Sequence, residues 1–159
     1  RAAGDNVKIM DTRKTIPLLR QAQKYAVRIG GAHNQRYGLY DEILIKENHI
    51  RAGGGIAATL KKAQQLTATA PQIEVRNNDE LQQAVAAGAT RILLDNFSLA
   101  ATKAAVASVP ATIEIESSGN VQLENIAALV ACGVDRISIG ALTKNIQAVD
   151  FSLQVNDNE

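Results

Sequence analysis

Charged and glycine-bearing positions follow the short apolar runs of this sequence, and they are the residues best able to do chemistry. The stretch "DTRKT", residues 11–15, follows the run "VKIM" and places Arg13 beside Lys14. The other positions of this kind are Lys46, Glu74, Asp95, Ser118 with Gly119, and Gly140. Residues of these types are rarely chosen to pack a buried strand. The pattern therefore predicts that they form a site.

The residue types indicate what such a site would bind. Arginine offers a planar fork to a carboxylate, and lysine offers a compact charge. Two acids can hold Mg²⁺ when phosphate oxygens complete its coordination. Small residues such as Gly119 and Gly140 let backbone N–H groups approach an oxyanion. The set favours a small anionic ligand.

Six strand-then-helix units can be read along the chain. The strands are predicted at residues 7–10, 43–45, 73–75, 91–94, 112–116 and 136–139. The first helix is predicted behind Pro17, where Leu18, Ala22, Tyr25 and Ile29 recur three or four residues apart. Further helices are predicted at 56–66, after Asp79 as N-cap, after Ser98 as N-cap, and from Leu123 to a stop at Gly133, with a weaker segment after the last strand.

This order predicts an α/β fold with parallel strands, because parallel strands need helical crossovers. The carboxyl ends of such strands face one crevice, which would gather the polar residues named above. A closed eightfold barrel takes about 250 residues, so 159 residues predict an incomplete or open barrel of about six β/α units, as one partial domain. No G-x-G-x-x-G follows the first strand, which argues against a dinucleotide-binding sheet.

Composition narrows the class of partner. The chain is 46% apolar and 21% charged, which is typical of one globular domain, and it starts with neither a signal peptide nor a membrane span. Its single cysteine suits a reducing cytoplasm. The net charge is +1, but residues 1–51 hold ten Lys and Arg against five Asp and Glu. With 3% aromatic residues and no Trp, this basic third suits a small anion better than nucleic acid, and no membrane partner is expected.

Several long motifs resemble one family, the quinolinate phosphoribosyltransferases. They are "DTRKTIPLLRQAQKYAVRIGGAHNQRYGLYDEILIKENHI", "IEV", "AGATRILLDNF", "ESSGN" and "ISIGALT", in the family's order. The resemblance implies transfer of phosphoribose from phosphoribosyl pyrophosphate to the ring nitrogen of quinolinate, with release of pyrophosphate and CO₂. The product implied is nicotinate mononucleotide, a precursor in NAD biosynthesis.

The resemblance also implies roles for individual residues. Quinolinate would be bound by Arg13, Lys14, Gln35, Arg36 and Lys46, and the catalytic groups would be Lys14, Lys46, Glu74 and Asp95. Glu74 and Asp95 would also hold Mg²⁺, the implied cofactor. The 5′-phosphate would be bound by Ser118, Gly119, Asn120 and Gly140.

Two departures from the family pattern stand out. The family usually has His where this chain has Gln35, and Gln can hydrogen-bond but never carry charge. The family also has an N-terminal domain, which contributes an Arg to the site of a partner subunit and is absent here, so a homodimer or higher homo-oligomer is implied. Because the chain begins with "RAAGDN" and lacks an initiator Met, we expect it to be a fragment with little activity alone.

Alternatives stay open for the whole chain and for single residues. The chain could be a related phosphoribosyltransferase with a nicotinate-like or molybdenum-associated acceptor, or a non-catalytic module that retains the barrel. Glu74 could form a surface ion pair with Arg76. His33 and His49 are 16 residues apart without a third ligand, so zinc is not expected, and His49 could line the pocket or bond locally. Cys132 is expected to be a small buried hydrophobe.

Overall fold

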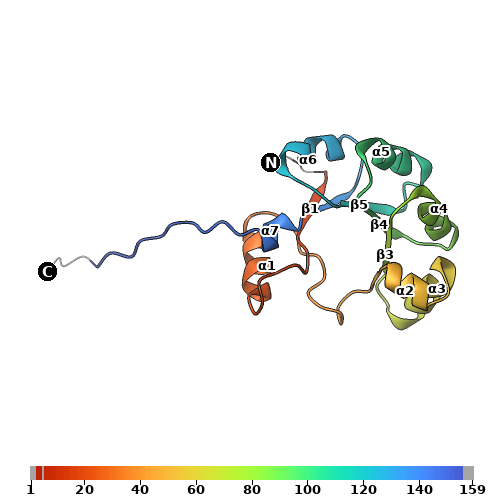
Figure 1. Ribbon diagram of the computed structural model, residues 1–159, viewed down its shortest axis with the longest axis horizontal. Helices are drawn as coiled ribbons and strands as arrows, with labels where there is room; N and C mark the ends of the chain where they lie inside the picture. The colour runs from red at the N-terminus through yellow and green to blue at the C-terminus, as the bar shows by residue number, and fades with distance from the viewer. Residues whose placement is uncertain (1–2, 5, 156–159) are drawn as a thin grey trace.

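The computed structural model describes residues 3–4 and 6–155, which form a six-stranded parallel sheet in the order β1-β6-β5-β4-β3-β2 (Figure 1). The strands are β1 (Lys8–Met10), β2 (Leu44–Ile45), β3 (Gln72–Val75), β4 (Arg91–Asp95), β5 (Glu114–Ser118) and β6 (Arg136–Ser138). The helices are α1 (Arg20–Ile29), α2 (Glu47–Ala52), α3 (Ile56–Leu66), α4 (Asn78–Ala86), α5 (Leu99–Ser108), α6 (Leu123–Val130) and α7 (Ala141–Lys144). The predicted α/β order of six units is confirmed.

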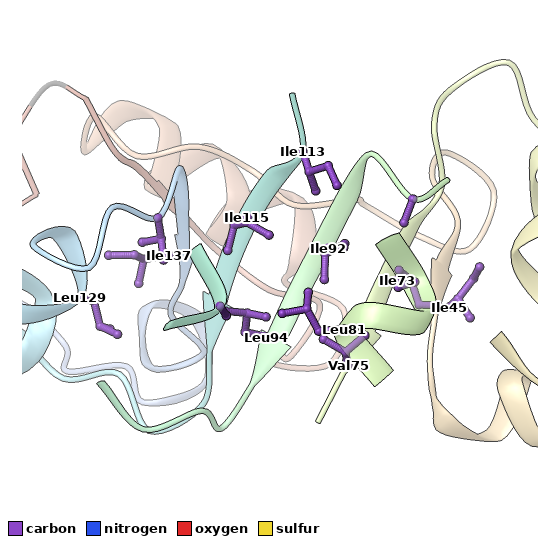
Figure 2. Close-up of a cluster of buried hydrophobic side chains, with 14 of the residues drawn as sticks. Ile45, Ile73, Val75, Leu81, Ile92, Leu94, Ile113, Ile115, Leu129 and Ile137 are labelled. Carbon is purple, nitrogen blue, oxygen red and sulfur yellow. The ribbon is translucent and has the colours of Figure 1, made fainter. Parts of the chain in front are cut away.

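The two faces of the sheet differ in polarity because successive side chains of a strand point to opposite faces. One face carries an aliphatic set that packs against helices, and Figure 2 shows it running from Ile137 across Ile115 and Ile92 to Ile73. Burying each such side chain contributes about 1.5–3 kcal/mol. The opposite face carries a polar set and has almost no aliphatic residues. We call it the polar face: Gln72, Glu74, Arg91, Asp95, Glu114, Glu116, Ser118, Arg136 and Ser138.

The barrel is open, as predicted. β1 and β2 follow each other in the chain but lie at opposite edges of the sheet, and no ladder joins them within the described residues. The segment between them crosses from one edge to the other (Figure 1). It is anchored at one end by a bridge between Met10 and His33 and at the other by Gln72, whose N–H donates to Ile43 O at 2.9 Å. The segment thus spans the gap that a closed barrel would fill with strand pairing.

Three predicted element starts are wrong by two residues or more, each for a local reason. α1 begins at Arg20 and not behind Pro17, because Leu18 adopts φ 68°, a left-handed conformation that a helix excludes. α4 is capped by Asn77 and not Asp79, since Asn77 has extended backbone and its side chain accepts the Glu80 N–H at 2.9 Å. β5 starts two residues later than predicted, because Ile113 N–H donates to Pro110 O in a turn.

The apolar stripe of α1 predicts the helix correctly but lies on its outer side. Tyr25 and Ile29 are 61% and 69% exposed, whereas Lys24 is the buried residue of α1. A groove of about 530 Å³ runs between α1 and α7, and its lining is almost wholly apolar. The groove therefore leaves an apolar surface of this helix in solvent.

The chain beyond α7 extends away from the barrel (Figure 1). Its apolar residues Val149, Phe151, Leu153 and Val155 alternate with polar ones and are all exposed. None of the helices in the described part of the chain combines the length and apolar character that crossing a bilayer requires.

Candidate active site

The predicted site residues lie at the carboxyl edge of the sheet. Strand register places Asp95 beside Ser118, and Ser118 beside Ser138, two residues before Gly140. Glu74 is on the same face of β3, diagonal to Asp95, because Glu74 pairs with Leu93. Lys46 follows β2 directly, and Arg13 and Lys14 follow β1. Parallel pairing thus brings together residues as far apart in sequence as Arg13 and Gly140, 127 positions.

Lys46 and Glu74 form an ion pair between Nζ and Oε2 at one side of this edge. The Glu74 side chain is 9% exposed and that of Lys46 is 45% exposed, so a buried carboxylate meets a cation that reaches solvent. The alternative of a pair between Glu74 and Arg76 is wrong. Arg76 instead donates to Glu80 at 3.2 Å and lies on the outer surface.

A short helix that the sequence did not reveal positions Lys46. α2 has only six residues, too few to show a helical period, and Lys46 is its N-cap. His49 Nδ1 accepts the Lys46 backbone N–H at 3.0 Å, which is local bonding and one of the two roles considered for this histidine. The contact fixes the backbone from which the Lys46 side chain leaves.

Arg13 and Arg36 form the cationic side of the site. Burial lowers the pKa of Arg36, and the nearby charge of Arg13 lowers it further, while Asp41, Glu42 and Glu74 oppose the shift. Arg13 Nε is buried and has no hydrogen-bond partner within residues 3–4 and 6–155. A buried donor left unpaired costs about 1–3 kcal/mol. A carboxylate is the partner that would both satisfy this donor and relieve the repulsion between the guanidinium groups.

Lys14 lies next to the loop at the end of β6. A Cβ atom added at Gly140 would lie 3.7 Å from Lys14 Cδ and 3.7 Å from Lys144 Cε, so two lysines flank this glycine. Thr143 Oγ1 donates to Lys14 O at 2.8 Å and joins α7 to the turn. Lys144 was not predicted from the sequence, where it lacked a strand end to mark it.

The loops after β4 and β5 interlock through residues with left-handed backbone. Asn96, Gly119 and Asn120 have φ values of 56°, 100° and 48°. Asn96 N–H donates to Ser118 O at 2.8 Å, and Asn120 Nδ2 donates to Asn96 Oδ1 at 3.3 Å. A Cβ at Gly119 would collide with the Asn96 side chain, so only glycine fits. Asn96 was missed by sequence reasoning, although an Asn directly after a strand-end acid is a common left-handed residue.

Gln35 lies beneath the site and not at its surface. Its side chain is buried, and Nε2 lies 2.5 Å and 2.6 Å from the two carboxylate oxygens of Glu116. Glu116 is fully buried and also accepts from Gln72 and Ser138, with Arg136 Nε 3.3 Å away as its ion-pair partner. Gln35 thus supports the floor of the site. The sequence missed Glu116, although its alternation with Ile115 placed it on the polar face.

Glu74 and Asp95 suit a metal ion whose other ligands come from a bound molecule. The described residues contain no group of three or more His, Cys, Asp or Glu able to cage a metal ion. Glu74 and Asp95 are two carboxylates on neighbouring strands, and Asp95 Oδ1 accepts a side-chain N–H from Asn96 at 3.1 Å. Mg²⁺ is commonly held by one or two carboxylates plus phosphate oxygens. The donor set fits that mode.

Cys132 is not among the residues at the carboxyl edge of the sheet. It is half-buried and not fully buried as predicted, because it follows the end of α6, where its thiol lies 3.2 Å from Ala128 O and 3.5 Å from Leu99 O.

An open parallel barrel with cations, acids and tight glycine loops at one edge belongs to the class of α/β barrels, whose ligand sites lie at the carboxyl ends of their strands. Within that class, the chain belongs to the quinolinate phosphoribosyl transferase family, since residues 1–154 match its C-terminal domain.

Relatives in several bacteria support this assignment. The chain is 44% identical over 153 residues to a probable nicotinate-nucleotide pyrophosphorylase [carboxylating] of Bacillus subtilis, covering 95% of this chain and 53% of the relative. It is 42% identical over 157 residues to the protein of that name in Mycobacterium leprae, covering 96% and 55%. A solved nicotinate-nucleotide pyrophosphorylase structure from Francisella tularensis superposes with a TM-score of 0.92 at 50% identity, covering 98% and 56%. The chain spans about half the length of these relatives.

Proposed function

We propose that this chain is the catalytic barrel of an enzyme that converts quinolinate and phosphoribosyl pyrophosphate to nicotinate mononucleotide, pyrophosphate and CO₂, in NAD biosynthesis. The observation that carries the proposal is the buried, unpartnered Nε of Arg13 beside Arg36, at the edge that also holds Glu74 and Asp95. A dicarboxylate can satisfy two cations, and a ribosyl carbon that becomes cation-like is stabilised by acids. The names of the relatives agree with this reaction.

The cations would bind and orient quinolinate. Arg13, Arg36, Lys14 and Lys46 would hold its two carboxylates, which places the ring nitrogen toward the acids. The nitrogen lone pair forms the bond to the ribosyl carbon as the bond from that carbon to pyrophosphate breaks. One carboxylate then leaves as CO₂, its electron pair stays on the ring carbon, and that carbon takes up a proton. Lys14 and Lys46 would stabilise the negative charge that develops there.

The acids and the loops of the same edge would hold the phosphoribosyl part of the cosubstrate. Glu74 and Asp95 would bind ribose hydroxyls and Mg²⁺, and this ion, when bound, would neutralise charge on the pyrophosphate that leaves. Ser118, Gly119, Asn120 and Gly140 would bind the 5′-phosphate through loop N–H groups, and the two lysines that flank Gly140 add charge of the right sign.

A further domain and association of subunits are proposed to complete the active site. We propose that the protein forms a homodimer or larger homo-oligomer, in which a further domain, corresponding to the rest of the relatives' length, adds to the site. The exposed apolar groove between α1 and α7 supports association of this kind. We also propose a cytoplasmic location, since one half-buried cysteine is suited to reducing conditions.

Formation of nicotinate mononucleotide from quinolinate, phosphoribosyl pyrophosphate and Mg²⁺ tests the proposal. We expect little product from residues 1–159 and substantial rates from a form that includes the missing half of the relatives' length. In that longer form, Lys14→Ala and Lys46→Ala should each lower kcat at least about tenfold, as loss of one transition-state contact does. Full turnover in both variants, or equal rates with nicotinate as acceptor, would refute the assigned roles.

A further inference from the structure

Helix α1 presents two basic side chains toward the segments that carry the pocket arginines. Arg20 and Lys24 are four residues apart, so they lie on the same side of the helix. One of these segments, residues 11–15, follows β1 and contains Arg13. The other, residues 33–37, lies between α1 and β2 and contains Arg36. Neither basic side chain was assigned a role in the proposed reaction.

Arg20 uses its whole guanidinium to join the two segments. Its Nη2 donates to Arg13 O at 3.2 Å and its Nε to Thr15 Oγ1 at 3.2 Å. Its Nη1 donates to Tyr37 O at 3.0 Å. Two of these three bonds reach one segment and the third reaches the other, so the planar fork sets the spacing between them.

Lys24 makes the same connection one turn further along. Its Nζ donates to Asp11 Oδ1 at 2.5 Å and to Gln35 O at 2.7 Å, and the side chains of Lys24 and Asp11 are fully buried. The Asp11 carboxylate in turn accepts Gln35 N–H at 2.8 Å and Asn34 Nδ2 at 2.6 Å. Two residues after Asp11 comes Arg13, and one residue after Gln35 comes Arg36.

The pocket needs such a connection because its arginines repel each other. Burial lowers the pKa of Arg36, and the charge of Arg13 lowers it further. Without a restraint, two mobile segments would let these charges move apart, and a dicarboxylate would have to bring them together on binding.

We propose that Arg20 and Lys24 are positioning residues that hold Arg13 and Arg36 together in advance of binding, so that the pocket favours a ligand with two carboxylates over a ligand with one. The proposal rests on the proposed function. Loss of the connection costs most for a ligand that must engage both segments at once, and less for a ligand that one segment can hold.

Calorimetric titration of the longer form, which spans the relatives' full length, with quinolinate and, separately, with the monocarboxylate nicotinate tests this. Arg20→Met should raise the Kd of quinolinate about tenfold and that of nicotinate less than about threefold, as expected when preorganisation is lost. The control is Arg28→Met, which removes the same charge from an exposed position of α1 and should leave both values unchanged. A purely structural role would weaken both ligands equally.

Thr15→Val provides a milder variant if Arg20→Met does not fold. It removes one acceptor of Arg20 and should shift selectivity in the same direction by a smaller factor. If wild type binds quinolinate selectively and the folded variants keep that selectivity, the positioning role is wrong and the proposed function stands. If wild type binds no quinolinate, both are wrong.

Discussion

Buried charges on the polar face are matched residue by residue, and this matching is what allows acids and cations to occupy a barrel interior. Glu116 receives donors from Gln35, Gln72 and Ser138, with Arg136 as its counterion. Removing one donor would leave a buried carboxylate partly unsatisfied. Gln35 supplies its donor from an amide group, which cannot carry a charge.

Glu114 gives a pH dependence whose sign follows from its partners. Burial acts to raise the pKa of Glu114, but the hydrogen bond and charge of Arg136 and the charge of Arg91 together lower it. A carboxyl group with a lowered folded pKa stabilises the fold above its unfolded pKa, near 4.5, and that contribution is lost as the pH falls through the folded value.

Glu114→Gln should therefore flatten the acid side of the stability profile. Urea unfolding of wild type and variant between about pH 6 and pH 3 measures the slope. We expect wild type to lose more stability over this range than the variant. If the free energy of unfolding changed equally with pH in both proteins, the ion pairs of Glu114 would not be responsible for the pH dependence.

The N-cap of α4 gives a test of what stabilises one helix of the fold. Asn77 accepts the Glu80 N–H, so Asn77→Ala should lower the free energy of unfolding by about 1 kcal/mol. Asp79 lies inside the first turn of α4, where its charge interacts only with the helix dipole, so Asp79→Ala should cost a few tenths of a kcal/mol. Urea denaturation of both variants compares them, and the reverse order would contradict the observed cap.

Helices long enough to show a repeating apolar pattern were predictable from the sequence. A helix as short as α2 was not. Residues 56–66 show a full helical period and form α3 as predicted, whereas the six residues of α2 show none. Strand-end residues such as Lys46 and Asp95 were predictable because parallel topology alone brings strand ends together. Asn96, Glu116 and the outward direction of the α1 stripe depend on which chain segments meet in space, which local pattern does not encode.

The groove between α1 and α7 is an apolar surface that the described part of the fold leaves uncovered. Ala22 and Ala26 on α1 and Leu142 on α7 line the groove, and Ile146 continues it toward the extended chain end. We expect the chain to self-associate through this groove. Ala22→Asp should shift sedimentation toward monomer, and Gln21→Asp, the adjacent position outside the groove, should not. A monomeric wild type, or equal effects of both variants, would contradict this.

The central claim is that the carboxyl edge of this barrel binds one dicarboxylate. The cations that hold it are Arg13, Arg36, Lys14 and Lys46. Titration calorimetry of the longer form with quinolinate tests it most directly, with Arg36→Met as the site variant and the exposed Lys61→Met of α3 as the matched loss of charge. The account predicts one quinolinate per chain, affinity at least about tenfold lower in Arg36→Met, and no change in Lys61→Met. Unsaturable binding, or equal affinity in all three proteins, would contradict it.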